Sequence, residues 1–290
     1  MPTQSQPTVG LALSGGAARG MAHVGVLRAL TENNISIGCV AGTSAGSIVG
    51  GAFATGMPVQ EIEELGRNLR WRDIGRVTMS RLGVQSNERL EQYLRAHLPI
   101  SRFEELPIPF AAVATELKTG AAVILRDDGD LPFAIRASCA IPGWYVPVAD
   151  SQGRQLVDGG LVAVIPATVT RSLGADIVIA VDVNGAGATF IGASSSVVGV
   201  LLQSMLVVQK TASHYQLELS DFVIKPQVAH IRWDEMGRAD ELIAAGYEAG
   251  LECVPQIHEL IDEFVRSQPR WYQLRRRKKL PVKPPLTLPT

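Results

Sequence analysis

The sequence predicts an α/β protein with a mostly parallel central sheet, and two observations support this prediction. Hydrophobic residues make up 46% of the 290 residues but aromatic ones only 6%, so the apolar content is mainly aliphatic, and there are 28 glycines. This composition suits buried parallel strands better than an aromatic-rich β-sandwich. Residues 8–55 also follow the order strand, loop, helix, strand, turn, helix, which is typical of a parallel sheet.

The first unit can be divided into elements from its apolar runs and its glycines. The short apolar run at 8–13 predicts a buried strand, and the apolar positions of 21–33 recur at helical spacing. The expected elements are a strand over 8–13, a glycine loop over 14–20, a helix over 21–33, a strand over 35–41, a sharp turn over 42–46 and a helix of small residues over 47–55. Because adjacent parallel strands end at the same edge of a sheet, the loop and the turn are expected to lie together.

The later part of the chain continues the alternation of strands and helices. Residues 58–98 are expected to be helical and charged, with a break near Gly83. The further expected elements are strands over 110–116 and 121–125 joined through 118–120, a helix over 131–138, a short strand ending at 156–157, a helix over 166–173 that opens with proline, strands over 177–183 and 222–225, and a long amphipathic helix over 240–264.

Charge divides the chain into an acidic body and a basic tail. The residues from Arg266 to the end include eight Lys or Arg and no Asp or Glu, which leaves 19 basic and 28 acidic residues in 1–265. We therefore expect one domain over 1–265, with its chemical motifs within 9–183, and a basic, proline-containing tail over 266–290. An acidic body offers no broad basic face, so no nucleic-acid partner is expected.

The cysteines and the start of the chain indicate a reducing compartment. Cys39, Cys139 and Cys253 cannot all pair within the chain and share no metal-ligand spacing. A disulfide scaffold and a structural zinc site are therefore not expected. Residues 1–10 lack a charged start followed by an apolar run, so no secretory signal is expected and a cytoplasmic location is the default.

One uncharged stretch, residues 183–209, has to be tested as a membrane span. It contains several polar residues and glycines, and only 197–208 is densely apolar. A spanning helix needs about 20 predominantly apolar residues. We therefore expect a loop followed by an apolar helix that packs against the body or lies at a membrane surface.

The segment Gly42-Thr-Ser-Ala-Gly46 matches the pattern G-x-S-x-G. Where a strand runs into a helix through a strained turn, this pattern places the serine at the apex with its hydroxyl exposed. Ser44 is thus a candidate nucleophile, and the Ala45 N–H at the start of the following helix can stabilise a developing negative charge. Alone, the pattern also fits an ordinary Gly/Ser turn; the strand before it and the helix after it favour the nucleophile.

The glycine loop Gly15-Gly-Ala-Ala-Arg-Gly20 leaves backbone N–H groups free to face an anion. A dinucleotide site would need glycine in place of Ala17 and a carboxylate at the end of the second strand, and neither is present. An oxyanion hole is the better interpretation. Arg19 could bind an anionic head group or brace the loop, and the sequence favours neither.

Asp158-Gly159-Gly160 closes a short strand and places a carboxylate in a tight turn. Asp158 can serve as the general base for a serine if partial burial raises its pKa. A serine–histidine–aspartate triad would instead require one of five histidines, none of which sits in a glycine-rich loop at a strand end. The histidines are His23, His97, His214, His230 and His258. A Ser–Asp dyad is therefore favoured over a triad.

Together these motifs resemble those of the patatin-like phospholipases, in particular bacterial members near the neuropathy-target-esterase branch. The resemblance lies in residues 13–27, in the turn over 42–46 and in the turn over 158–160, and it extends to 137–143 and 147–148. It implies a three-layer α/β/α fold and hydrolysis of fatty-acyl esters of lipids by a Ser–Asp dyad.

Carried over residue by residue, the resemblance makes Ser44 the nucleophile and Asp158 the base. It implies an oxyanion hole formed by the backbone N–H groups of Gly15, Gly16 and Ala17. Two positions depart from the family pattern: Ala17 replaces the usual third glycine of the loop, and Ala163 stands where many members have asparagine. Both departures bear on the rate more than on the type of reaction.

The predicted activity is that of a serine lipid acyl hydrolase that works through an acyl-enzyme, with no metal and no cofactor. An acyltransferase on the same dyad and a catalytically idle regulatory protein on the same fold are the alternatives. The expected partner is a lipid or fatty-acyl ester. In the tail, Trp271 and Tyr272 stand beside five consecutive cations, as residues 275–279. This pattern is compatible with peripheral contact with the anionic inner membrane surface, but such a charge run is more often a solvated, flexible tail.

Overall fold

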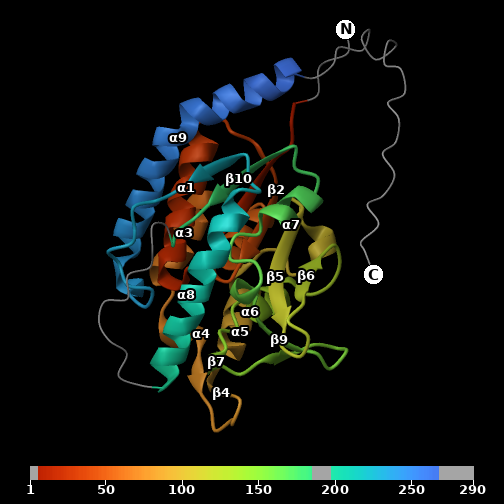
Figure 1. The fold of residues 1–290 in the computed structure, drawn as a ribbon, viewed down its shortest axis with the longest axis vertical. Helices are drawn as coiled ribbons and strands as arrows, with labels where there is room; N and C mark the ends of the chain where they lie inside the picture. The colour runs from red at the N-terminus through yellow and green to blue at the C-terminus, as the bar shows by residue number, and fades with distance from the viewer. Residues whose placement is uncertain (1–5, 185–196, 268–290) are drawn as a thin grey trace, which may run out of the picture.

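The computed structural model describes residues 6–184 and 197–267 (Figure 1). Its main sheet contains eight strands in these residues, in the order β11-β10-β1-β2-β5-β9-β8, with β6 paired to β5 on its other side. The strands are β1 (Val9–Leu13), β2 (Ile37–Thr43), β5 (Phe110–Glu116), β6 (Ala122–Arg126), β8 (Val148–Ala149), β9 (Gln155–Asp158), β10 (Ile177–Val181) and β11 (Phe222–Ile224). From β11 to β5 the neighbours are parallel, whereas β6, β8 and β9 are antiparallel additions.

Helices cover both faces of this sheet, which makes the fold a three-layer α/β/α sandwich. The helices are α1 (Met21–Glu32), α2 (Ala45–Ala54), α3 (Val59–Asn68), α4 (Trp71–Ile74), α5 (Glu88–His97), α6 (Leu131–Ser138), α7 (Ala167–Ser172), α8 (Val197–Leu217) and α9 (Ala239–Ser267). Leu11 and Leu13 of β1 pack into the larger core with α1, α2 and α9, while Ala12 packs on the other face with α7. Figure 1 shows α9 lying along α1. The predicted fold class is confirmed.

Strand β5 brings the ends of two other strands together. Its first half, Phe110–Val113, pairs in parallel with β2 up to Thr43. Immediately beyond the end of β2, Ala114 pairs with Asp158 at the end of the antiparallel strand β9. Two strands that run toward each other along β5 therefore end at neighbouring positions, and the residues that follow them meet.

The region 58–98 differs from the sequence-based expectation of charged helix broken at Gly83. It contains α3, α4 and α5, but between α4 and α5 the chain forms the hairpin of β3 (Arg76–Val77) and β4 (Gly83–Ser86). Strand β4 also pairs in parallel with β7 (Gly143–Tyr145), forming a second, three-stranded sheet. The hairpin is held by this pairing with a strand distant in sequence, a contact that local periodicity does not reveal.

Helix α8 begins where the apolar helix was expected and continues past 208 to Leu217. Within the described parts of the chain, no helix is long and apolar enough to cross a membrane. Residues 185–196 of the predicted loop, and the basic tail except for Arg266 and Ser267, lie outside the described residues.

Candidate active site

Ser44 occupies a sharp turn between β2 and α2. Its backbone has φ 52° and ψ −123°, a left-handed conformation that side-chain-bearing residues rarely adopt. The Ser44 N–H donates to the Ser138 hydroxyl at 2.8 Å, which fixes the turn. A Cβ at Gly46 would overlap the carbonyl of Leu13, so glycine there lets α2 pack closely against the end of β1. The turn has the geometry that the G-x-S-x-G pattern predicts.

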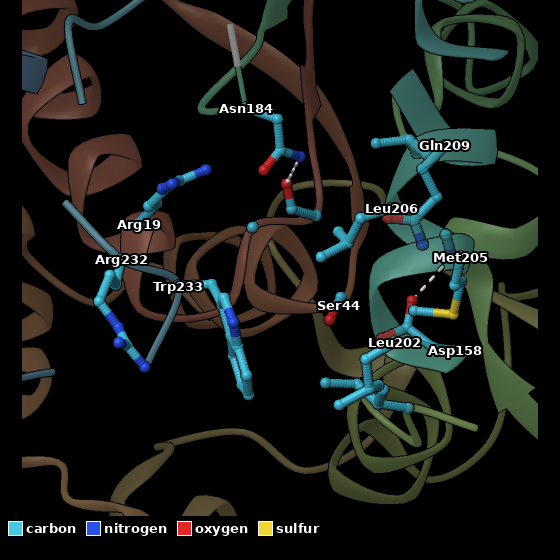
Figure 2. Close-up of a pocket in the computed structure, with 16 residues that line it drawn as sticks. Arg19, Ser44, Asp158, Asn184, Leu202, Met205, Leu206, Gln209, Arg232 and Trp233 are labelled. Atoms are coloured by element: carbon cyan, nitrogen blue, oxygen red, sulfur yellow. Dashed lines mark hydrogen bonds between the residues drawn. The ribbon is translucent and has the colours of Figure 1, made fainter. Parts of the chain in front are cut away.

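Asp158 is held beside Ser44 by backbone contacts on several sides. Its N–H donates to the Ala140 carbonyl at 2.9 Å, and its carbonyl oxygen accepts from the Thr115 hydroxyl at 2.9 Å. The carboxylate Oδ1 accepts from the Gly160 N–H at 2.7 Å, and the neighbouring Ser44 side chain lowers the pKa of the carboxyl. Figure 2 shows Ser44 and Asp158 next to each other in one pocket. The structure thus brings the two predicted catalytic residues together.

Burial tunes the Asp158 carboxyl toward a base that works near neutral pH. The side chain is almost fully buried, and desolvation raises its pKa from 3.8 to about 6, although the Ser44 side chain and the hydrogen bond from the Gly160 N–H oppose this rise. At pH 7 to 8 the carboxyl is mostly ionised, yet its affinity for a proton is higher than that of an exposed aspartate. This combination suits proton abstraction from a serine hydroxyl.

The pH dependence of the hydrolytic rate should reveal this pKa. Only the ionised form of Asp158 can accept the serine proton, so kcat/KM is expected to rise about tenfold per pH unit below a pH of about 6 and to level off above it. The measurement is the pH profile of hydrolysis of an uncharged, water-soluble ester. A profile that is flat between pH 5 and 8 would contradict the assignment of Asp158 as the base.

The glycine loop supplies some of the expected oxyanion donors but not all of them. The Gly15 N–H donates to the Val164 carbonyl at 3.0 Å, so this predicted donor is already engaged in holding the loop. Among the described residues, no acceptor engages the N–H groups of Gly16, Ala17 or Ala45. Ala17 and Ala45 each begin a helical segment, whose first N–H groups have no partner within the helix. These three N–H groups are the available donors beside Ser44.

The two departures from the family pattern leave the backbone of the site intact. Ala17 itself adopts φ 48°, the left-handed conformation that a glycine would favour, at a cost of roughly 1–2 kcal/mol. Ala163 ties two parts of the site together through its backbone: its carbonyl accepts from the Thr43 hydroxyl at 2.7 Å, and its N–H donates to Gly159 at 2.8 Å.

Gly16 has no room for a side chain, and this predicts a specific defect and its rescue. A Cβ at Gly16 would overlap Cγ2 of buried Val183. In Gly16→Ala the loop must therefore shift, and its N–H groups no longer point at the position of the oxyanion. Since one lost oxyanion donor typically lowers kcat by about 100-fold or more, we expect a loss of that size. The double variant Gly16→Ala/Val183→Ala should recover most of the rate relative to Val183→Ala alone. A Gly16→Ala variant that hydrolyses esters at the parent rate would place the oxyanion hole elsewhere.

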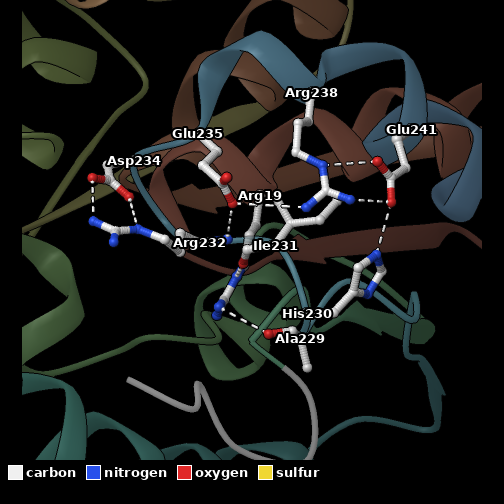
Figure 3. Close-up of polar contacts among 9 residues, drawn as sticks. All are labelled: Arg19, Ala229, His230, Ile231, Arg232, Asp234, Glu235, Arg238 and Glu241. Atoms are coloured by element: carbon white, nitrogen blue, oxygen red, sulfur yellow. Dashed lines mark hydrogen bonds and ion pairs between the residues drawn. The ribbon is translucent and has the colours of Figure 1, made fainter. Parts of the chain in front are cut away.

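Arg19 braces the loop instead of pointing an unengaged charge into the pocket. The side chain is buried, and its Nε donates to the Ile231 carbonyl at 2.7 Å while Nη2 donates to the Ala229 carbonyl at 3.4 Å (Figure 3). Burial lowers the pKa of its guanidinium. The geometry is that of the bracing alternative, which ties the glycine loop to the segment before α9.

The five histidines lie in other contacts. Buried His23 donates from Nε2 to the Ser14 carbonyl at 2.9 Å, and burial lowers its pKa to about 4, so it stays neutral. His97, His214, His230 and His258 contact Tyr93, Glu218, Glu241 and Asn33 respectively. In the described parts of the chain, no histidine is hydrogen-bonded to Ser44 or Asp158, as the dyad interpretation requires.

Several residues that build the site were not singled out from the sequence. Segment 137–143 was noted only for its resemblance; it supplies Ser138 to the Ser44 turn and the Ala140 carbonyl to Asp158. Cys139 in the same segment is buried, and burial together with the negative Asp158 raises the pKa of its thiol, so it remains a neutral wall of the site. Asn184 donates to the Gly15 carbonyl at 2.6 Å and fixes the far side of the loop.

Two cavities meet at Ser44. The first contains the dyad and the glycine loop and is bounded by α8 residues on one side and by Arg232 and Trp233 on the other (Figure 2). The second runs along α2 into the interior between α1, α3 and α5. Apart from Ser44, His97 and the polar atoms of a few aromatic rings, its lining is apolar, so it suits a long apolar group and not a charged one.

The fold and the sequence both have known counterparts. The model of the family described as Patatin-like phospholipase matches residues 11–171, more than half of the chain. Over 187 residues the chain is 40% identical to an uncharacterized NTE family protein of Mycobacterium tuberculosis, across 63% of this chain and 51% of that protein. Over 275 residues it is 29% identical to patatin-like phospholipase domain-containing protein 7 of Rattus norvegicus, across 83% of this chain and 20% of that protein.

A solved structure shares the fold at low sequence identity. VipD from Legionella pneumophila aligns over 90% of this chain and 67% of its own, with a TM-score of 0.53 and 14% identity. The chain spans about half the length of its mycobacterial relative and a fifth of the rat one. The family match over 11–171 contains Ser44, Asp158 and the glycine loop, and with it the chain belongs to the patatin-like phospholipase family.

Proposed function

We propose that this protein is a serine lipid acyl hydrolase, a carboxylic ester hydrolase that cleaves fatty-acyl esters through a Ser44–Asp158 dyad. The observation that carries the proposal is the meeting of the two cavities at Ser44. The first cavity, which holds a buried base and free N–H donors, suits the ester group, and the apolar channel at the same hydroxyl suits the acyl chain. Membership of the phospholipase family supports a lipid as the substrate.

The proposed reaction needs only groups of the chain and water. The Asp158 carboxylate takes the proton from Ser44 Oγ as Oγ bonds to the ester carbonyl carbon, and the Gly16, Ala17 and Ala45 N–H groups stabilise the oxyanion. When the intermediate collapses, the alcohol leaves with the proton from Asp158 and the acyl group stays on Ser44. Water then attacks the acyl-enzyme, gives its proton to Asp158, and releases the fatty acid while Ser44 recovers its proton.

The apolar channel predicts how chain length is limited. Ala52 lines the channel eight residues beyond Ser44 along α2, about 12 Å at the helical rise. In Ala52→Leu the larger side chain should obstruct long acyl chains, so kcat/KM should fall about tenfold or more for long-chain esters but stay within about twofold for acetyl or butyryl esters. The measurement is a series of p-nitrophenyl esters on both proteins. An equal loss on every ester would indicate a folding defect rather than a blocked channel.

The activity itself is tested with purified protein, a panel of short-to-long acyl esters and a phospholipid. Release of free fatty acid supports hydrolysis, and transfer to an added alcohol or lysolipid would indicate the transacylase alternative. No turnover with any ester, together with no labelling by a fluorophosphonate, would contradict the proposal and favour an idle member of the family.

A further inference from the structure

Exposed apolar side chains gather at the β3–β4 hairpin, residues 76–86. Among the described residues, fourteen large apolar side chains are exposed; four lie in 77–84, and five lie on α8. Within the hairpin, Met79 is fully exposed, Val77 is 73% exposed and Leu82 is 56% exposed. A short protruding turn that presents several large apolar groups to water is costly unless another surface covers them.

The same hairpin is basic on an otherwise acidic body. Residues 70–89 contain five arginines but only Asp73 and Glu88 as acidic residues. Arg76 precedes the exposed apolar residues and Arg81 lies among them. Both are exposed, and neither forms an ion pair within the part of the chain that the structure describes. A tip with exposed apolar groups and unpaired cations beside them matches an anionic lipid surface, because the acyl chains accept the apolar groups and the anionic head groups attract the cations.

The hairpin is physically connected to the active site. Gly83 and Gln85 of β4 pair with β7, which continues the segment that carries Ser138 and Ile141. Trp144 of β7 and Trp71 of α4 each pack edge-on against Trp233, with ring centroids 6.4 and 6.0 Å from that of Trp233. Tryptophan is the residue type that settles at the head-group level of a bilayer. The hairpin and the N-terminal end of α8, with exposed Val200 and Leu201, also lie at the same end of the molecule (Figure 1).

We propose that the β3–β4 hairpin docks on an anionic lipid bilayer, inserting Met79 and Leu82 among the acyl chains while Arg76 and Arg81 contact the head groups. The docked hairpin would hold the first cavity, which Trp233 bounds, close to the membrane, so that a lipid can reach it without crossing bulk water. The proposal rests on the proposed function only in taking a membrane lipid as the substrate. A second copy of the chain or a protein partner on this surface is an alternative outcome of the test.

Binding is measured by flotation with the full chain, tail included, in a Ser44→Ala background so that the vesicles stay intact. Vesicles of phosphatidylcholine alone are compared with mixed phosphatidylcholine and phosphatidylglycerol vesicles at low and high salt. Met79→Asp/Leu82→Asp should reduce binding to mixed vesicles about tenfold or more. Arg76→Gln/Arg81→Gln should reduce it about 30-fold at low salt and much less at high salt. Leu251→Asp, at an exposed apolar position on α9, is the matched control and should bind like the parent.

With Ser44 restored, both hairpin variants should keep normal turnover of a soluble short-chain ester and lose turnover of vesicle lipid. This pattern shows that the variants fold and that only docking has changed. If the hairpin variants float like the parent, or if Leu251→Asp is equally impaired, the docking proposal is wrong. If light scattering shows that the parent dimerises and the hairpin variants do not, the surface serves a second copy. Absent turnover of soluble ester by the unmodified protein contradicts the proposed function and leaves the flotation result valid.

Discussion

Replacing Ser44 with alanine is expected to abolish ester hydrolysis, because the variant lacks the Oγ atom on which the acyl group would be carried. Loss of a nucleophile in such a unit typically lowers kcat by about 10⁶-fold. Labelling by a fluorophosphonate should vanish in parallel. Hydrolysis by a preparation of Ser44→Ala that is free of contaminating esterase would contradict the enzymatic interpretation as a whole.

Because the backbone at Ser44 has a positive φ, Ser44→Gly is a matched control for Ser44→Ala. An alanine at this position would keep the left-handed conformation and hence the strain, so Ser44→Ala should unfold near the parent temperature. Glycine adopts this conformation without a Cβ penalty, so Ser44→Gly should be more stable by about 1 kcal/mol and equally inactive. Thermal unfolding of the three proteins measures this order. A glycine variant less stable than the alanine variant would show that the turn is not strained.

Replacing Asp158 with asparagine is expected to remove nearly all activity while making the protein more stable. The amide oxygen can still accept from the Gly160 N–H, so the turn should persist, but an amide cannot take the serine proton. We expect kcat to fall by about 10²- to 10⁴-fold, the range typical of losing a positioned general base. In a parallel scan, alanine at each of the five histidines should leave substantial activity, whereas one inactive histidine variant would favour a triad.

The gain in stability follows from the sign of the pKa shift. The Asp158 pKa is 3.8 for an ordinary aspartate and about 6 in the folded protein, so folding favours the protonated form. The contribution of the protonated Asp158 carboxyl to the stability of the fold is fully present below a pH of about 3.8 and is lost as the pH rises through about 6. Above that pH the buried charge lowers the free energy of unfolding by up to about 3 kcal/mol.

Asp158→Asn removes this charge and should therefore raise the unfolding temperature at pH 8, with a smaller gain at pH 5. Unfolding followed by circular dichroism at the two pH values is the measurement. A variant that is destabilised at pH 8 would show that the ionised carboxylate contributes more through its hydrogen bonds than it costs through burial.

Much of the fold and the site could be predicted because the signals are local. Ser44 lies where a buried aliphatic strand passes through a glycine-containing turn into a helix. The residues that predict these three elements are adjacent in the sequence, so the unit can be recognised from local patterns alone. The strand at 110–116 and the helix at 131–138 were predicted with the boundaries observed, since apolar pattern and turn residues agree there. The family resemblance, which the family model confirms, rests on these same short motifs.

Only the tertiary structure decided which groups meet and which are already engaged. Asp158 comes beside Ser44 because Val113 and Ala114 of β5 pair with the ends of β2 and β9, a register that neither strand's own sequence encodes. The Gly15 N–H donates to the Val164 carbonyl, and the Arg19 side chain donates to two backbone carbonyls. All three acceptors are distant from their donors in the sequence. The hairpin at 76–86 exists because β4 pairs with β7. Hydrogen bonds and burial between distant segments depend on how the whole chain packs. The availability of an N–H donor and the pKa of a buried carboxyl therefore follow from the folded state. The residue types that perform the chemistry are already present in the sequence.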